Sequence, residues 1–429
     1  MTQISSAQKG VVTDQIKQVA TSEGYPVETI RKQVAKGWIV IPHNPIHNPI
    51  TCGIGKNLRV KVNANIGTSR EHCDLSEEIQ KAQVAEKAQA HAIMDLSTGG
   101  DLTKIRNELL KNISVPFGTV PVYQAGIEAI TNHGSIIDMT EDDIFNVFEN
   151  QAKQGVDFTV AHVGITKESV NRLKNQHRLI PMVSRGGSFH MAWIIHHQEE
   201  NPIYKNFDYL LDIARKYDVT LSLGDGMRSG ALYDSNDRAK FQEMLIIGEL
   251  VEKARKAGVQ TMVEGPGHMP LQDIQSNIQV MKTVTRDAPY FVLGPLVTDI
   301  APGYDHFVGG IGGALAGFFG ADFLCYLTPA EHLSLPDIND VREGVIATRI
   351  AAHAADIARG KDCDIDNEFS NARESLDWNK MFELAIDPVK AKQYREKRSP
   401  KEDRSACSMC GNLCAIEMVQ KYLKEIQSD

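Results

Sequence analysis

The fold is decided by the stretch Val60-Lys61-Val62-Asn63-Ala64-Asn65-Ile66-Gly67-Thr68-Ser69, in which a short apolar run ends in polar residues and a glycine. Comparable runs recur at residues 92–96, 115–122, 158–163, 180–183, 220–223, 260–263 and 289–293. Between most of them lie amphipathic segments of helical period, at residues 76–91, 140–155, 239–257 and 271–286. Eight alternating strand–helix units in this length of chain predict an α/β fold, a (βα)8 barrel of the TIM type.

Smaller segments flank the predicted barrel, which we place at residues 58–360. Residues 1–57 are expected to form an N-terminal α/β region, with helices at residues 6–22 and 27–36 and a strand at residues 38–42. Past the eighth predicted strand, an apolar helix opens at the glycine-rich residues 309–313, and a further apolar run follows at residues 323–327. Residues 361–429 are expected to form C-terminal helices that carry a cysteine-rich tail.

The composition is that of an ordinary globular protein. Of 429 residues, 42% are hydrophobic and 24% are charged, which is enough to bury a large core. A net charge of −9, without a basic run interleaved with aromatics, argues against nucleic-acid binding. The sequence has neither a signal-peptide pattern nor an apolar stretch of bilayer length, so we expect a cytoplasmic protein without membrane contact. Seven cysteines, an odd number, indicate a reducing compartment rather than a disulfide framework.

Polar residues and glycines gather at the carboxyl ends of the predicted strands, as in residues 63–69, 94–100, 184–188, 224–228 and 264–268. Barrel enzymes build their active sites from the loops at this face. The asymmetry therefore predicts an active site for a small molecule at the carboxyl end of the barrel.

One of these ends, Ser184-Arg185-Gly186-Gly187-Ser188, offers the groups that an anion needs. Glycines leave backbone N–H groups accessible, and two hydroxyls and a guanidinium stand beside them. Arg228, at a neighbouring strand end, adds a second guanidinium. We interpret the run as a phosphate site; the alternative is an ordinary turn between a strand and a helix.

Two histidines, His268 and His332, follow strand-like runs and would meet on the same face of the barrel. Two imidazoles can hold a divalent metal such as zinc and leave positions open for a chelating substrate. Two ordinary hydrogen-bonded histidines are an equal alternative. The carboxylates of Asp225, Glu264 and Asp299 suit acid–base work or amine binding, although such residues also cap helices.

The tail places three cysteines, Cys407, Cys410 and Cys414, within eight residues. Three thiolates can hold a [4Fe–4S] cluster by three of its irons and leave the fourth iron open for a ligand. A structural zinc knot is the alternative, but it needs four ligands, and neither Cys nor His follows Cys414. Two other classes of function stay open: a zinc hydrolase that uses the two histidines, with the tail as a structural knot, and a non-catalytic ligand-binding barrel.

Several longer segments resemble one known family. They include Glu264-Gly265-Pro266-Gly267-His268 and residues 63–69, 94–100, 184–188, 293–306 and 407–411, and the resemblance covers nearly the whole chain. The sequence is similar to the phosphomethylpyrimidine synthase family of thiamine synthesis, a non-standard radical S-adenosylmethionine family. Its paralogue, 5-hydroxybenzimidazole synthase of anaerobic cobamide synthesis, shares the same segments.

The resemblance implies which residues act. Family cluster ligands fall on Cys407, Cys410 and Cys414, and family metal ligands fall on His268 and His332. A tyrosine that contacts substrate in the thiamine pattern is replaced by Phe291. The other family substrate positions fall on Asn65, Met94, Tyr123, His162, Ser184, Arg185, Gly186, Asp225, Gly226, Met227, Arg228 and Glu264.

The resemblance also implies a reaction on 5-aminoimidazole ribotide, with a [4Fe–4S] cluster, S-adenosylmethionine and a divalent metal. An electron, from a donor such as flavodoxin or ferredoxin, would cleave S-adenosylmethionine. The 5′-deoxyadenosyl radical would then take hydrogen from the ribose and start a rearrangement that releases formate. Members of the family are expected to be homodimers in which the C-terminal arm enters the partner's barrel.

Departures from the thiamine pattern lie where the substrate is expected. Ser229 replaces a proline, the tyrosine moves from the Phe291 slot to Tyr290, and residues 307–310 replace a threonine- and serine-containing run. Loss of the proline is expected to free the backbone beside the substrate, and Tyr290 should point to the opposite side of its strand. We therefore predict 5-hydroxybenzimidazole, for the lower ligand of cobamides, as the product; the alternative is phosphomethylpyrimidine.

Overall fold

A computed structural model describes residues 1–398 and 406–427 of the chain. The chain divides into two compact units, Met1–Asp356 and Ile357–Asp429. The first unit contains the barrel and the N-terminal region, and the second contains the cysteine tail. Each unit is described by itself below.

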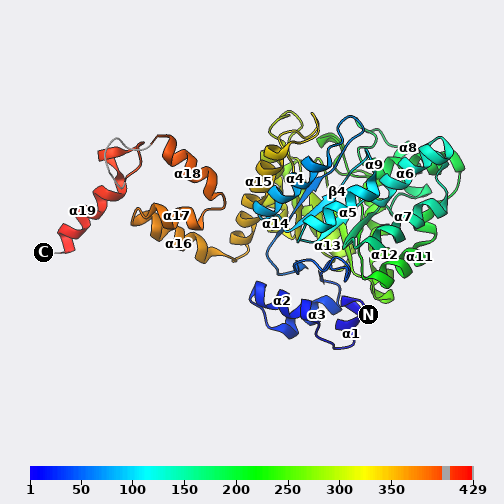
Figure 1. Cartoon of the computed structure of the whole chain (residues 1–429), viewed down its shortest axis with the longest axis horizontal. Helices are drawn as coiled ribbons and strands as arrows, with labels where there is room; N and C mark the ends of the chain where they lie inside the picture. Colours follow the sequence, from blue (N-terminus) through cyan, green and yellow to red (C-terminus); the bar gives the residue numbers. More distant parts are fainter. Residues whose placement is uncertain (399–405, 428–429) are drawn as a thin grey trace. The chain divides into compact units, whose positions relative to one another are not determined.

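Eight parallel strands of the first unit close into a barrel, which confirms the predicted fold (Figure 1). The first and last strands pair with each other, so the barrel has no open edge. In their order around the barrel, the strands are β3 (Lys61–Ile66), β4 (Ala92–Asp95), β5 (Phe117–Thr119), β6 (Phe158–Ala161), β7 (Thr220–Leu223), β8 (Thr261–Gly265), β9 (Tyr290–Leu293) and β10 (Phe323–Cys325).

Helices cover the outside of the strands (Figure 1). They explain why the strands read as continuous apolar runs, because each strand is buried on its inner face by the barrel core and on its outer face by a helix. The longer helices are α4 (Leu75–Lys87), α5 (Leu102–Asn112), α6 (Pro121–His133), α7 (Glu141–Gln154), α8 (Lys167–Lys174), α9 (Arg185–His197), α11 (Phe207–Tyr217), α12 (Arg238–Ala257), α13 (Leu271–Val284), α14 (Asp305–Phe319) and α15 (Ile338–Ala358).

Aromatic side chains fill the barrel interior beneath the carboxyl ends of the strands. Phe291 stacks on Phe323 with ring centroids 4.3 Å apart, and Phe158 meets Phe323 edge-on at 6.4 Å. Each of the three rings is at most 5% exposed. This packed layer forms a floor, so only the space above it is open to a ligand.

One predicted strand is wrong. Residues 180–183 form a loop rather than a strand, and Ile180 and Val183 in it are 39% and 40% exposed. The run contains Pro181, which cannot donate a hydrogen bond to a neighbouring strand. The eighth strand is instead β10, within the apolar run at residues 323–327 that was expected to follow the eighth strand.

The N-terminal region contains α1 (Gln3–Gln8), α2 (Asp14–Glu23), α3 (Val27–Ala35) and a two-stranded antiparallel sheet of β1 (Ile39–Val40) and β2 (Ile54–Gly55). The single helix predicted at residues 6–22 is in fact two helices. They are separated at Gly10, whose φ of 81° is left-handed, and α2 restarts at Thr13, whose hydroxyl accepts the Ile16 N–H.

The second unit consists of short helices: α16 (Cys363–Glu374), α17 (Trp378–Leu384), α18 (Pro388–Lys397), η3 (Gly411–Leu413) and α19 (Ala415–Gln427). The three clustered cysteines lie around η3, immediately before α19. Across residues 1–398 and 406–427, none of the helices combines the length and apolar character needed to cross a bilayer.

Candidate active site

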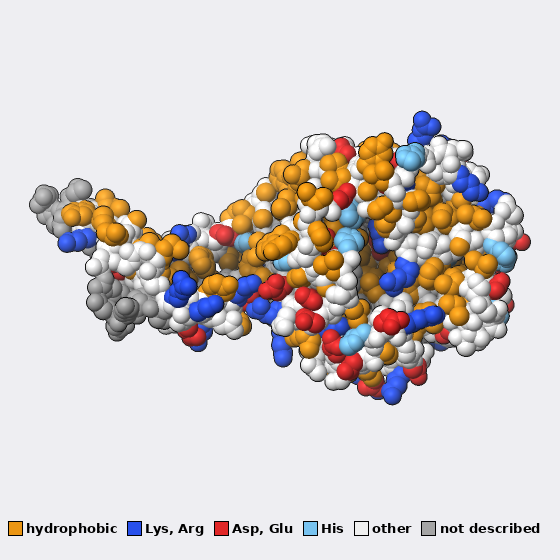
Figure 2. Space-filling model, turned by 90° about the horizontal axis from the view of Figure 1, so that it is seen from above, with side chains coloured by type: hydrophobic (Ala, Val, Ile, Leu, Met, Phe, Trp, Pro, Cys, Tyr) orange, Lys and Arg blue, Asp and Glu red, His pale blue; other side chains and the backbone are white. Residues whose placement is uncertain are grey.

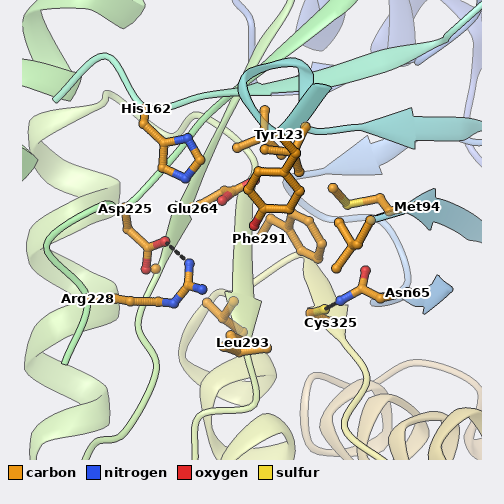
Figure 3. Close-up of a pocket in the computed structure, with 15 residues that line it drawn as sticks. Asn65, Met94, Tyr123, His162, Asp225, Arg228, Glu264, Phe291, Leu293 and Cys325 are labelled. Atoms are coloured by element: carbon orange, nitrogen blue, oxygen red, sulfur yellow. Dashed lines mark hydrogen bonds and ion pairs between the residues drawn. The ribbon is translucent and has the colours of Figure 1, made fainter. Parts of the chain in front are cut away.

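A pocket with a cavity volume of about 90 Å³, partly open to solvent, lies at the carboxyl ends of the barrel strands (Figure 3). Figure 2 shows histidine and basic side chains beside a hollow in the barrel unit. The pocket is lined by Asn65, Met94, Leu96, Val120, Tyr123, Val160, His162, Asp225, Arg228, Glu264, Gly265, Phe291, Val292, Leu293 and Cys325.

Most of the predicted substrate residues are brought together in this pocket, although they come from strand ends up to about 230 positions apart. The pocket includes Asn65, Met94, Tyr123, His162, Asp225, Arg228, Glu264 and Phe291. Ser184, Arg185, Gly186, Gly226 and Met227 are not among its lining residues.

One wall of the pocket is polar. Arg228 Nη1 lies 3.3 Å from Asp225 Oδ1 (Figure 3). Ser222 donates a hydrogen bond of 2.7 Å to Glu264 Oε1. Burial, reinforced by the neighbouring Asp225, raises the pKa of Glu264 to about 8. Burial also raises the pKa of Asp225, against the opposing influence of Arg228. At neutral pH the wall therefore combines a guanidinium with a mostly protonated Glu264.

Several buried polar atoms on this wall lack a protein partner within the described residues. They are His162 Nδ1, Asp225 Oδ2 and Arg228 Nε. Burial holds the pKa of His162 well below its usual value, so its imidazole is neutral. Because buried polar groups are normally hydrogen-bonded, these atoms are positions for a polar ligand or for ordered water.

The pocket lining also includes apolar side chains, those of Met94, Leu96, Val120, Val160 and Phe291. The sequence did not single out Leu96, Val120 or Val160, because apolar strand residues carry no chemical signal of their own.

Cys325 is another pocket residue that the sequence missed, because its run was not counted among the eight predicted strands. Asn65 Nδ2 lies 3.0 Å from Cys325 Sγ, and Asn63 Nδ2 donates a 2.8 Å hydrogen bond to Asn65 Oδ1. Burial raises the pKa of the Cys325 thiol to about 12, so it stays protonated. The signal that could have identified it is the buried run at residues 323–325, whose length matches a barrel strand.

The predicted anion run begins helix α9 next to the pocket. Ser184 is the N-cap, and its hydroxyl accepts the Gly187 N–H at 3.1 Å. A side chain at Gly186 would collide with the His162 ring, which explains the glycine. The guanidinium of Arg185 lies over the Tyr123 ring, 5.0 Å from its centroid. The run therefore adjoins two pocket residues, His162 and Tyr123.

Ser229 was expected to leave the backbone free where a proline is lost, and this expectation is wrong. Ser229 is fully buried, its hydroxyl donates to the His268 carbonyl, and its own carbonyl accepts the His268 N–H at 3.2 Å. The backbone beside Arg228 is therefore fixed, not freed. Tyr290, by contrast, points away from the pocket as predicted, since its hydroxyl donates to Asn277 at 3.0 Å on helix α13.

The two predicted metal histidines are neighbours, with ring centroids 5.3 Å apart. His268 Nδ1 lies 2.7 Å from Asp299 Oδ1, and His332 Nδ1 lies 3.3 Å from Asp305 Oδ1. A carboxylate at Nδ1 selects the tautomer whose Nε2 lone pair is available for a metal. Among the described residues, however, no three His, Cys, Asp or Glu side chains gather closely enough to hold one ion, so other ligands would have to complete the coordination.

The cysteine turn is compact. Gly411 N–H donates to the Cys407 carbonyl at 3.0 Å, and Leu413 N–H donates to the Cys410 carbonyl at 2.9 Å. Hydrogen bonds from the backbone N–H groups of Cys410 and Met409 lower the pKa of the Cys407 thiol. Cluster thiolates bind different irons and need not meet at one point, so this turn suits a cluster better than a single ion.

The chain has relatives with known names. The chain belongs to the Radical SAM ThiC family, whose model matches residues 2–421. It is 57% identical over 426 residues to the phosphomethylpyrimidine synthase of Caldanaerobacter subterraneus subsp. tengcongensis, covering 99% of this chain and 98% of the relative. It is 54% identical to the phosphomethylpyrimidine synthase of Methanocaldococcus jannaschii, covering 99% of this chain and 100% of the relative. The predicted family is thus confirmed, and the chain is a radical S-adenosylmethionine enzyme.

Among solved structures, one match is a dihydropteroate synthase from Coxiella burnetii in complex with pteroic acid. It has a TM-score of 0.43 and 11% identity, with 73% of this chain and 99% of that chain covered.

Proposed function

We propose that this chain is a phosphomethylpyrimidine synthase, which converts 5-aminoimidazole ribotide to the phosphorylated hydroxymethylpyrimidine of thiamine. The observation that supports this most strongly is its identity of 52–57% over 426 residues to proteins named for that activity. The match covers at least 98% of each of these relatives, so both the barrel and the cysteine tail are included.

The alternative predicted product, 5-hydroxybenzimidazole, has less support. The relatives described above are named for the pyrimidine, and one structural premise for the benzimidazole fails, because Ser229 is held by His268. Phe291 gives the pocket an apolar ring contact that is compatible with either heterocycle.

The cysteine turn fits a [4Fe–4S] cluster, with Cys407, Cys410 and Cys414 as ligands, because it offers three thiols and a backbone that favours the Cys407 thiolate. When bound, the cluster supplies the electron that cleaves S-adenosylmethionine to a 5′-deoxyadenosyl radical. We propose flavodoxin or ferredoxin as the class of electron donor, and a homodimer as the active form. Light scattering checks the latter, with a mass near twice 47.4 kDa expected.

The barrel side chains bind and orient the ribotide. Arg228 supplies positive charge in the pocket, and Arg185 with the N-terminus of α9 offers a site for the phosphate behind Tyr123. Glu264 in its neutral form and Asp225 are available to the ring nitrogens and the amine. Met94 and Phe291 contact the ring and exclude water, which protects radical intermediates from side reactions.

Product identity tests the proposal. Reconstituted protein is incubated anaerobically with 5-aminoimidazole ribotide, S-adenosylmethionine and dithionite, and the products are separated by liquid chromatography with mass detection. We expect the pyrimidine phosphate together with 5′-deoxyadenosine and formate. A fluorescent 5-hydroxybenzimidazole would make the alternative product correct, and absence of 5′-deoxyadenosine would contradict both.

The histidine pair suits a divalent metal, and zinc matches its two imidazoles. We propose that His268 and His332 hold this metal and that Asp299 and Asp305 fix their tautomers. Replacing His268 by alanine is expected to abolish stoichiometric metal binding, and Asp299→Asn is expected to weaken it about 10-fold to 100-fold. Metal content after dialysis and zinc titration measure both effects; His72→Ala, at an exposed histidine near α4, is the control. Unchanged zinc affinity in His268→Ala would remove the proposal.

Turnover should fall on the alkaline side because of Glu264. Its pKa of about 8 means that the carboxyl is neutral below pH 8 and becomes charged beside Asp225 above it. The added negative charge repels Asp225 and the ribotide phosphate, so kcat/KM is expected to decrease about tenfold per pH unit above pH 8. Glu264→Gln keeps a neutral side chain, so the variant should be less active but should not lose kcat/KM above pH 8. The same decrease of kcat/KM above pH 8 in the variant would show that another group titrates.

A further inference from the structure

Glu243 is a buried glutamate that lies outside the pocket. It is on helix α12, is 1% exposed, and is not among the residues that line the site. Glu243 Oε1 accepts the Gly226 N–H at 2.8 Å, and Oε2 accepts the Met227 N–H at 2.8 Å. Two successive backbone N–H groups form a concave site for acceptor atoms, and here both carboxyl oxygens of Glu243 occupy it.

The same turn is held on its other side by Arg178. Arg178 Nη2 donates to the Met227 carbonyl at 2.8 Å, and Nη1 donates to the Pro181 carbonyl at 3.1 Å. Its Nε donates to Asp237, which also caps helix α12 by accepting the Lys240 N–H at 2.8 Å. The Met227 peptide groups are thus fixed at both the N–H and the carbonyl.

This double attachment explains why Gly226 and Met227 do not line the pocket. Their N–H groups face α12, whereas the residues on either side, Asp225 and Arg228, face the pocket. The turn closes with Arg228 N–H donating to the Asp225 carbonyl at 3.1 Å. Both ends of the ion pair therefore depend on the position of two peptide groups that Glu243 holds.

We propose that Glu243 is a positioning residue that sets the geometry of the Asp225–Arg228 turn and so the affinity of the pocket for the ribotide. The proposal deepens the proposed function and rests on it for the identity of the ligand. Other carboxylates do not replace Glu243, because Asp225 faces the pocket and Asp237 is bound to Arg178 and the start of α12.

The test is Glu243→Gln, which keeps the volume but offers a single acceptor oxygen and places an NH2 group against one of the two N–H donors. Calorimetric titration of the protein with 5-aminoimidazole ribotide is expected to give a Kd raised about tenfold, the usual scale for one unsatisfied buried N–H group. If Glu243→Gln does not fold, Arg178→Lys, which acts on the other side of the same turn, replaces it in the titration.

Asp157→Asn is the matched control. Asp157 is also fully buried and accepts two backbone N–H groups, those of Asn44 at 2.7 Å and Phe117 at 2.8 Å, but it lies just before β6, at the amino end of the strands. We expect it to lower the melting temperature while leaving the Kd within about twofold of wild type. An equal loss of affinity in Asp157→Asn would show that general destabilisation, not positioning, is the cause.

A double-mutant cycle tests whether Glu243 acts through Arg228. On an Arg228→Lys background, the added Glu243→Gln should change the Kd less than about twofold, since the group it positions is already altered. Independent, multiplying effects would overturn the proposal, as would wild-type affinity in Glu243→Gln alone.

Hydrogen exchange separates this inference from the proposed function. In Glu243→Gln, the amides of residues 226–227 are expected to exchange faster, whereas those near Asp157 keep their wild-type rates. If wild-type protein does not bind the ribotide, the proposed function fails. The exchange result alone then decides whether Glu243 positions the Asp225–Arg228 turn.

Discussion

Cys410→Ala abolishes turnover and leaves ribotide binding intact. The two remaining thiols of the turn cannot hold a cluster by three irons, so reductive cleavage of S-adenosylmethionine stops. The pocket lies wholly within Met1–Asp356, whereas Cys410 lies in Ile357–Asp429, so the side chains that bind the ribotide are unchanged. Iron and sulfide content measures the cluster, 5′-deoxyadenosine formation measures cleavage of S-adenosylmethionine, and calorimetric titration measures ribotide binding.

Cys363→Ala is the control for this prediction. Cys363 is an exposed cysteine of the same unit, at the start of α16 and outside the cysteine turn. Its replacement should leave iron content and turnover at wild-type levels. Retained turnover in Cys410→Ala, or iron loss in Cys363→Ala, would mean that the cluster has other ligands.

Arg228→Met weakens ribotide binding by about 100-fold or more, the scale for removing the cation of a buried ion pair. Arg228 lines the pocket and lies 3.3 Å from Asp225, near Glu264. Methionine has similar length but no charge, so the ribotide phosphate loses a cation and the carboxyl of Asp225 loses its partner. Calorimetric titration gives the affinity, and thermal unfolding shows how far the fold is affected.

Arg172→Met provides the comparison. Arg172 lies on α8 and forms an exposed ion pair with Glu168 at 2.9 Å, with 44% and 60% of the two side chains exposed. Exposed pairs contribute little, so both affinity and melting temperature should stay close to wild type. If Arg228→Met bound the ribotide as well as Arg172→Met, Arg228 would not be part of the ligand site.

The barrel could be predicted because strand and helix periods are local properties of the sequence. Seven of the eight predicted runs correspond to strands, and the exception, residues 180–183, contains Pro181 in an apolar loop. The eighth strand was overlooked because closure of a barrel is not local. The run that includes Phe323 becomes a strand through pairing with β3 and β9, which lie far apart in the chain.

The polar part of the pocket was predictable for a related reason. Residues such as Asn65 and Glu264 stand at strand ends, and all parallel strand ends meet at one face of the barrel. Orientation within a turn was not predictable, since Gly226 and Met227 turn toward Glu243, a partner 16 to 17 positions away on α12. The fixed position of Ser229 likewise depends on His268, 39 positions further along.

Pairing of β10 with β3 has a consequence for protein synthesis. Asn65, on the first strand, and Cys325, on the last, are 260 positions apart and meet at one wall of the pocket. A growing polypeptide that has not yet released residue 325 from the ribosome has an incomplete ring, with the edges of β3 and β9 unpaired. Ligand can therefore stabilise this protein only after most of the chain has been made, and the early strands must be protected from aggregation without its help.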